Sequence, residues 1–193
     1  SSLELQGKFQ ESLSEIKRAQ DLDPLSPVIT NNVGEILSYM QRYDPAMEQL
    51  NKSLELDPNM PALLVSIAFV YTQQSRFDEA ITELQKARQI VGSKSPYADG
   101  DLGYVYAKAG KKADAIRILN QLLEFSNQGY VVAYQIASIY AGLGENNKAF
   151  EWLEKSYGEQ NSQLGYLKID PLWGSLRSDP RYTALLKKIR LDK

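Results

Sequence analysis

The sequence repeats itself with a period of 34 residues and one slip to 35. The dipeptide Asp23-Pro24 returns 34 positions later as Asp57-Pro58. An alanine keeps the same steps, at Ala46, Ala80, Ala115 and Ala149. Self-similarity at a fixed period of this length is typical of folds in which one small supersecondary unit is copied along the chain. The period therefore constrains the fold more than any single motif does.

Four further columns of residues keep the same period. They are a small column (Gly34, Ala68, Gly103, Ala137), an aliphatic column (Val33, Ile67, Leu102, Ile136), a column rich in tyrosine (Leu37, Tyr71, Tyr106, Tyr140) and a second aliphatic column (Ile16, Leu50, Leu84, Leu119, Leu153). Because these columns slip together, the slip indicates a single inserted residue near Ser95. We expect the repeats to be least regular there, over residues 89–96.

Each period predicts a helical hairpin. In residues 61–94 the apolar residues form two sets with helical spacing: Leu64, Ile67, Ala68, Val70 and Tyr71, then Phe77, Ala80, Ile81, Leu84 and Ala87. The stretch between the two sets is polar, and in later periods it contains glycines that suit a tight turn between helices. A single hairpin cannot bury its apolar face alone, so neighbouring hairpins must stack.

These periods resemble the tetratricopeptide repeat, a family of 34-residue helix-turn-helix units. The period that begins at Pro61 carries the family's small, aromatic and alanine positions as Ala68, Tyr71, Ala80, Leu84 and Ala87. It departs from the family pattern at Gly92, where the family has proline. The resemblance covers residues 5–161. It implies an all-α fold, a right-handed α-α superhelix of stacked helical hairpins (a solenoid), closed by a C-terminal helical cap.

We expect one solenoid domain over residues 1–193. Its parts are a partial repeat (1–26, mainly a second helix), four repeats (27–60, 61–95, 96–129 and 130–161) and a helical cap (162–193). In the cap the sequence predicts a short helix, a break at Pro171 and a last helix with Ser178 as N-cap. We assign Trp173 to the cap, which covers the end of the solenoid. This tail also resembles the end of tetratricopeptide regions in multidomain bacterial regulators.

Composition excludes several classes of function. The chain has no cysteine and no histidine, so it lacks thiolate nucleophiles, Cys/His zinc sites and the usual general base near neutral pH. Its net charge of -2 creates no general attraction for phosphate backbones, and we expect no nucleic acid to bind this domain. No apolar run reaches membrane-spanning length. We expect no cofactor, no metal and no enzymatic activity.

The compartment and the wider protein stay open at this stage. The cytoplasm is favoured, and the periplasm fits if a membrane span precedes this chain. The sequence begins without methionine, directly on an amphipathic pattern, so we expect a fragment of a longer protein.

Individual motifs that suggest chemistry have simpler structural interpretations. Asp23 and Asp57 are a full repeat apart, too far for an acid pair, and we interpret them as helix punctuation. The glycine-containing stretches 109–112 and 142–147 follow helices, whereas phosphate loops and dinucleotide loops follow strands. The cations near residue 190 suit the end of a last helix. A catalytic site would need a compact acid cluster, for which Glu35 and Asp101 are the candidates.

The resemblance implies that the first helix of each hairpin lines a concave groove that binds a partner. Carried over by register, our groove residues are Asn31, Glu35, Tyr39, Val65, Phe69, Gln73, Tyr104, Lys108, Tyr134 and Ser138. Phe69, Tyr104 and Tyr134 are the expected anchors, because exposed aromatic rows need a binding explanation. The alternative that they pack as core between first helices stays open.

The groove's charge narrows the class of partner. Family members that grip a chaperone's carboxyl terminus use lysine, arginine and asparagine; here Asn31 and Lys108 fit, but Glu35 and Asp101 oppose an anionic guest. A peptide or protein segment with apolar side chains is the more natural ligand. We therefore expect a non-catalytic protein-interaction module, the interaction or sensing region of a larger bacterial regulatory protein. The alternative is a structural module that self-associates, as a homo-oligomer.

Overall fold

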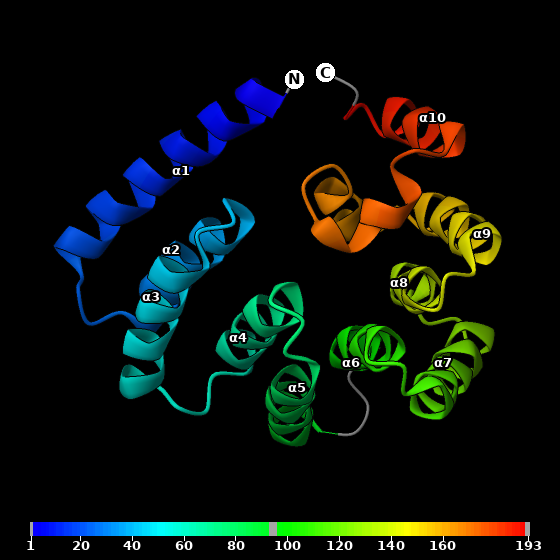
Figure 1. The fold of residues 1–193 in the computed structure, drawn as a ribbon, viewed down its shortest axis with the longest axis horizontal. Helices are drawn as coiled ribbons and strands as arrows, with labels where there is room; N and C mark the ends of the chain where they lie inside the picture. The colour runs from blue at the N-terminus through cyan, green and yellow to red at the C-terminus, as the bar shows by residue number, and fades with distance from the viewer. Residues whose placement is uncertain (1, 93–95, 192–193) are drawn as a thin grey trace. The chain divides into compact units, whose positions relative to one another are not determined.

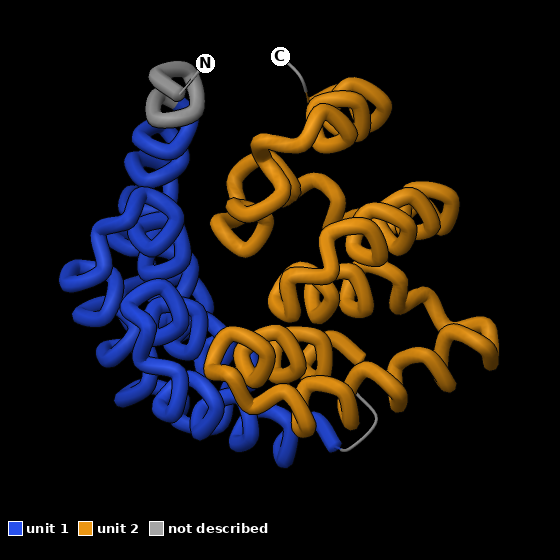
Figure 2. The backbone as a smooth tube through the Cα atoms, turned by 45° about the vertical axis from the view of Figure 1, so that its right-hand side comes forward, with its two compact units in different colours: residues 1–92 blue, residues 93–193 orange. Residues whose placement is uncertain are grey.

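The computed structural model describes residues 2–92 and 96–191, with side chains from Lys8 onward, and every element in those ranges is helical. The chain divides into two compact units, residues 1–92 and residues 93–193 (Figure 2). The boundary falls in the stretch that the inserted residue marks, although residues 93–95 themselves lie outside the described residues. The expectation of a single solenoid domain stays a prediction, and each unit is described by itself below.

The described residues of unit 1 form five α-helices (Figure 1): α1 (Ser2–Leu22), α2 (Pro27–Tyr39), α3 (Tyr43–Leu56), α4 (Pro61–Gln73) and α5 (Phe77–Val91). Helix α2 packs against α3, and α4 packs against α5, so each full period of unit 1 is a helical hairpin, as predicted. Helices α3 and α4 also touch, which joins the two hairpins through a shared core.

Helix α1 runs without a break through almost all of the predicted partial repeat. It packs against α2 and buries Leu13 in the same core as the two hairpins. At its end, the Gln20 side chain donates hydrogen bonds to Thr30 of α2, at 3.3 Å, and to Gln49 of α3, at 3.0 Å. The long helix is therefore fastened to the first hairpin at its C-terminal end.

Proline and aspartate mark the helix ends of unit 1 as the sequence predicts. Pro27 and Pro61 are the first residues of α2 and α4, where a missing backbone N–H costs nothing. Helix α3 ends at Leu56, and Asp57 Oδ1 then accepts a hydrogen bond from the Asn59 backbone N–H at 3.0 Å. Asp57 is thus a turn residue, which confirms its interpretation as punctuation.

The small-residue column lets the two helices of a hairpin lie close together. A Cβ on Gly34 of α2 would sit 2.6 Å from Cδ2 of Leu50 on α3, and Leu50 is fully buried. The Ser53 hydroxyl of α3 donates to the Pro27 carbonyl of α2 at 2.7 Å. Two columns of the sequence repeat therefore meet in space as a contact pair.

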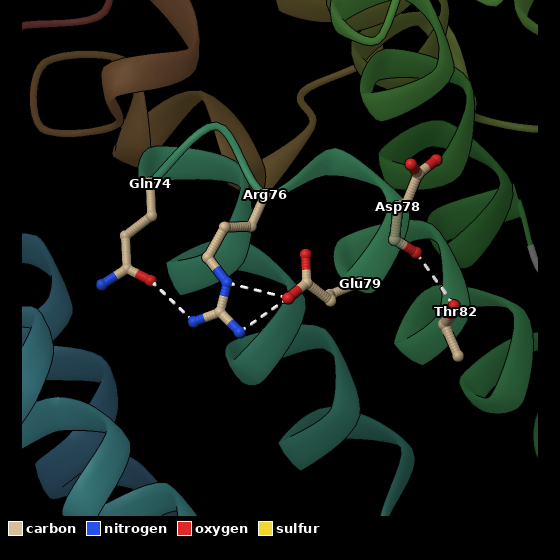
Figure 3. Close-up of polar contacts among 5 residues, drawn as sticks. All are labelled: Gln74, Arg76, Asp78, Glu79 and Thr82. Carbon is tan, nitrogen blue, oxygen red and sulfur yellow. Dashed lines mark hydrogen bonds and ion pairs between the residues drawn. The ribbon is translucent and has the colours of Figure 1, made fainter.

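Polar side chains secure the turn between α4 and α5 (Figure 3). Ser75 adopts a left-handed conformation with φ of 60°. Next to it, the Arg76 guanidinium donates to Glu79 Oε1 at 2.7 and 3.0 Å and to Gln74 Oε1 at 3.3 Å. The same guanidinium lies 4.2 Å from the centre of the Tyr71 ring, a cation–π contact. The ion pair between Arg76 and Glu79 therefore links the turn to the start of α5, and the contact between Arg76 and the Tyr71 ring links it to α4.

Unit 2 contains the later repeats and the tail. Its elements are α6 (Pro96–Lys108), α7 (Lys112–Asn127), α8 (Ala133–Gly142), α9 (Asn146–Gly158), two 3₁₀ helices, η1 (Ser162–Tyr166) and η2 (Pro171–Leu176), and α10 (Pro180–Lys188). Helices α6 and α7 pair, as do α8 and α9, and α6 also packs directly on α8. A Cβ on Gly103 would lie 2.4 Å from Cδ1 of Ile139, so glycine is what allows α6 to approach α8.

The tail differs from the expectation in two details. The predicted short helix is replaced by the two 3₁₀ helices on either side of the loop before Pro171. The N-cap of α10 is Asp179, whose carboxylate accepts from the Arg181 N–H at 2.9 Å, and not Ser178. The reason is that Pro180 occupies the first helical position, which makes the residue directly before it the cap.

Candidate functional site

A row of aromatic rings crosses unit 1. The rings of Phe9 and Tyr39 stack with their centres 6.1 Å apart, and the ring of Tyr39 meets that of Phe69 at 5.2 Å, tilted by 49°. All three side chains are half-buried, so each ring keeps part of its surface open to solvent. The row joins α1, α2 and α4, and part of the apolar surface of its rings is not covered by the rest of unit 1.

The predicted groove residues of unit 1 lie on α2 and α4, in two different environments. Five of them are half-buried and form what we call the α2–α4 face: Glu35, Tyr39, Val65, Phe69 and Gln73. Asn31 is instead buried, with 3% of its surface exposed, and its Oδ1 has no hydrogen-bond partner among the described residues. The face presented to solvent is therefore aromatic and aliphatic, with one carboxylate and one amide.

Glu35 is the charged group of the α2–α4 face. Its Oε1 accepts a hydrogen bond from the Ser66 hydroxyl of α4 at 2.8 Å. This bond holds the carboxylate between the two first helices. A negative charge fixed at this place disfavours an anionic guest and favours a neutral or cationic one.

In unit 2 the corresponding residues are mostly covered. Tyr104 is 9% exposed, Tyr134 6% and Ser138 3%, whereas Lys108 at the end of α6 is exposed. We call Asp101, Tyr104, Tyr134 and Ser138 the α6–α8 face. Two of the three expected anchors thus lie inside unit 2, while Phe69 in unit 1 keeps part of its surface open.

The chain's own tail covers Tyr134, the central aromatic residue of the α8 part of this face. Trp173 of η2 is fully buried, its ring meets that of Tyr134 edge to face at 5.2 Å, and its Nε1 donates to Tyr134 Oη at 2.9 Å. The Gln135 side chain of α8 donates a hydrogen bond to Gln163 of η1. The Tyr182 hydroxyl of α10 donates to the carbonyl of Leu167, which lies between η1 and η2. Residues 162–176 therefore form a segment packed on α8, which Figure 1 shows in orange.

Two carboxyl groups of unit 2, Asp170 in this segment and Asp101 on α6, have raised pKa values. Burial, with repulsion from the charge of Asp170, raises the pKa of Asp101 to about 7. Burial also raises the pKa of Asp170 to about 6, although the Leu172 N–H and the Arg177 guanidinium oppose the rise. The pKa of Tyr104 is raised as well, by burial and by the charge of Asp170. Asp101 and Asp170 therefore titrate much closer to neutral pH than ordinary aspartates, which ionise near pH 4.

Sequence reasoning named Asp101 but missed its acidic neighbour. Glu35, the other acid candidate, belongs to unit 1, and the carboxyl that acts on Asp101 is that of Asp170 in the tail. The signal was present in the dipeptide Asp170-Pro171, which falls out of the repeat period. The repeat period predicts contacts between residues of the repeats, but it does not predict which repeat residues an out-of-period residue such as Asp170 will influence.

Two further features of the described residues bear on function. No group of three or more acidic, cysteine or histidine side chains is placed to hold a metal ion among residues 2–92 and 96–191. In the same ranges, no helix combines the length and the apolar character needed to cross a bilayer.

Helical hairpins copied at this period define a helical-repeat protein. Two family models, both described as tetratricopeptide repeat, match the chain, one over residues 59–128 and the other over residues 30–60 and 131–162. These matches cover more than half of the sequence, and the chain belongs to the tetratricopeptide repeat family. Repeats of this family are generally scaffolds, and the fold supports a role as a protein–protein interaction module.

Several solved structures share this fold. TTC0263, a thermophilic TPR protein in Thermus thermophilus, is 18% identical with a TM-score of 0.66, over 96% of this chain and 94% of that one. PilW, a widely conserved type IV pilus biogenesis factor, is 19% identical with a TM-score of 0.61, over 96% and 87%. YrrB, a TPR protein with an unusual peptide-binding site, is 18% identical with a TM-score of 0.52, over 90% and 89%. None of the curated proteins compared matches the sequence.

Proposed function

We propose that this chain is a non-catalytic interaction module that binds a peptide or protein segment on the α2–α4 face. The observation that carries the proposal is the half-buried row of Phe9, Tyr39 and Phe69. Aromatic side chains are enriched at binding hot spots because they bury large apolar area at a small entropic cost. A partner that covers these rings gains most of its binding energy there.

The chemistry of the face indicates the class of segment. Apolar or aromatic side chains of the partner would pack on Tyr39 and Phe69, and Val65 extends the apolar area on α4. The Glu35 carboxylate, held by Ser66, favours a partner with a neutral or cationic group at that place. An anionic carboxyl terminus fits this face poorly, because its charge would oppose that of Glu35. One structural relative, YrrB, is itself described as having a peptide-binding site.

We also propose that this module serves as the interaction or sensing region of a larger regulatory protein. The support is the resemblance of residues 162–193 to the end of tetratricopeptide regions in multidomain bacterial regulators. In that role the α2–α4 face would select the partner, and chemistry would belong to another part of the protein.

A pull-down from an extract of the source organism tests the proposal. Wild type, the double variant Tyr39→Ala with Phe69→Ala, and the control Tyr97→Ala are immobilised in parallel; Tyr97 is 57% exposed on α6, outside the face. We expect the double variant to lose the specifically captured proteins, while the control keeps them. Circular dichroism checks that helical content is unchanged. Undiminished capture by the folded double variant would overturn the proposal.

A further inference from the structure

The α6–α8 face and the α2–α4 face stand at equivalent positions of the repeat but differ in exposure. Val65 and Phe69 of α4 are half-buried, whereas Tyr134 and Ser138, which occupy the same positions in α8, are buried. The residues that cover Tyr134 come from the tail, foremost Trp173. The difference therefore lies in what covers the face and not in the helix itself.

The covering segment is bound in the way that a peptide ligand is bound. Its largest anchor is an aromatic side chain, Trp173, fully buried, with its single N–H paired to Tyr134 Oη, and three leucines of the segment, Leu164, Leu167 and Leu176, are buried too. A second polar contact joins Gln163 to Gln135. An aromatic anchor with a few directed hydrogen bonds is the usual composition of a peptide-binding hot spot.

The segment has little secondary structure to hold it in place by itself. It consists of two 3₁₀ helices of five and six residues. Helices of this type are short and have poorer hydrogen-bond geometry than α-helices. The stability of residues 162–176 therefore depends on their contact with the rest of unit 2.

One part of the segment's interaction with unit 2 is unfavourable, because the charge of Asp170 adds to burial in raising the pKa of Asp101 on α6. Like charges in a partly buried place repel each other strongly. Arg177, after η2, lowers the pKa of Asp170, whereas burial and the charge of Asp170 raise the pKa values of Tyr104 on α6 and Tyr182 on α10. Arg177 also donates to the Asp170 carbonyl at 3.1 Å, which partly compensates the pair.

We propose that the α6–α8 face is a second protein-binding face, which residues 162–176 occupy as an internal ligand until a partner segment displaces them. The displacing segment carries an aromatic side chain that packs against Tyr134, ideally with an N–H donor for its hydroxyl oxygen. It carries no carboxylate opposite Asp101, and so it avoids the repulsion that the internal segment suffers. Displacement is easier as the pH rises through the range where Asp170 and Asp101 lose their protons.

Competition by synthetic peptides tests this proposal on the full chain. The first peptide has the sequence of residues 162–178 with asparagine in place of Asp170, and it carries a fluorescent label. Asparagine keeps the oxygen that accepts from the Leu172 N–H, at 2.8 Å in the chain, and removes the charge. The second peptide keeps the aspartate, and the third has alanine in place of Trp173.

Fluorescence anisotropy at pH 8 and pH 5 gives the affinities. At pH 8 we expect the asparagine peptide to bind the wild-type chain more tightly than the aspartate peptide, by about tenfold for each pH unit by which docking raises the Asp170 pKa. At pH 5 the preference becomes smaller, because the docked Asp170 is then largely protonated, and it vanishes only below the ordinary pKa of 3.8, where the free peptide is protonated as well. The peptide with alanine in place of Trp173 does not bind at either pH.

The same substitution made in the chain itself tests whether the peptides compete with the internal segment. Asp170→Asn in the chain strengthens the internal segment, so this variant binds every peptide more weakly than wild type does. Asp114→Asn, the same change at a surface ion pair of α7, leaves peptide binding unchanged. The Tyr39→Ala, Phe69→Ala variant also binds the peptides as wild type does, so failure of the α2–α4 face and failure of this proposal are distinguishable.

Hydrogen exchange of the wild-type chain needs no variant at all. We expect the amides of residues 162–176 to exchange through a local opening, faster at pH 8 than at pH 5 after correction for intrinsic rates. Exchange of these amides only together with α8, at both pH values, would overturn the proposal. Peptides that never bind, or that bind equally well without the aromatic anchor, would overturn it too.

Discussion

The Trp173 indole lies edge to face against the Tyr134 ring, and its N–H donates to the tyrosine hydroxyl oxygen at 2.9 Å. One residue belongs to the out-of-period tail and the other to the last regular repeat, 39 positions earlier. The contact ties the end of the chain to the repeats. It also removes an expected groove anchor, Tyr134, from solvent.

Loss of the Trp173 ring should destabilise unit 2 strongly. Trp173→Ala is expected to cost about 3–5 kcal/mol, because it leaves a cavity in a fully buried place. Trp173→Phe keeps most of the apolar volume but removes the hydrogen bond from the indole N–H to Tyr134 Oη, and should cost about 1–2 kcal/mol. Urea unfolding followed by circular dichroism measures both values.

Trp152 is the matched control for this prediction. It is half-buried on α9, where it lies beneath the Lys155 ammonium at 4.4 Å. Trp152→Phe should cost less than about 1 kcal/mol, since little buried volume is lost. Equal losses at the two tryptophans would contradict the role assigned to Trp173.

Gly103 should resist substitution because α6 and α8 touch there. A Cβ would lie 2.4 Å from Cδ1 of Ile139 and 3.1 Å from Cγ2 of Ile118. Gly103→Ala is therefore expected to cost about 1–3 kcal/mol through overpacking. The control is Gly158→Ala at the end of α9, where a Cβ has open space, so this change should be neutral or stabilise by up to about 1 kcal/mol. Thermal unfolding of the two variants decides the matter.

The stability of unit 2 should fall as the pH rises from about 4 to about 7. The docked carboxyls of Asp170 and Asp101 have pKa values of about 6 and about 7, while the unfolded chain releases these protons near the ordinary value of 3.8. Between those limits the folded state binds more protons than the unfolded state, so each rise in pH favours unfolding. Urea midpoints over this range measure the trend.

Asp101→Asn tests the source of that trend. The variant removes one of the two raised pKa values, so its loss of stability with rising pH should be smaller than in wild type. Asp114→Asn should retain the full wild-type dependence. A wild-type chain whose stability rises between pH 5 and pH 7 would contradict the assignment of the acid pair.

The repeat period predicts much of the fold because each column corresponds to a physical contact. Gly34 and Leu50 stand in two of the predicted columns and touch between α2 and α3. Pro61 begins a helix because its fixed backbone angle suits the first helical position. Such local rules work wherever the chain stays in register.

Prediction from sequence ends where the register ends. The two 3₁₀ helices, η1 and η2, and the influence of Asp170 on Asp101 depend on tertiary packing, for which the sequence has no periodic signal. Tyr104 and Tyr134 stand at the expected positions of their helices and are buried, and for Tyr134 the cover includes Trp173, from a segment outside the period. The same register places Phe69 on α4, where its ring keeps part of its surface open.

Hydrogen exchange with a captured partner tests the central claim most directly. The chain is compared alone and saturated with a protein isolated in the pull-down. Binding on the α2–α4 face predicts added protection in residues 27–39 and 61–73, and none in the Tyr39→Ala, Phe69→Ala variant. Protection confined to α7, α9 and α10, with α2 and α4 unchanged, would contradict the account.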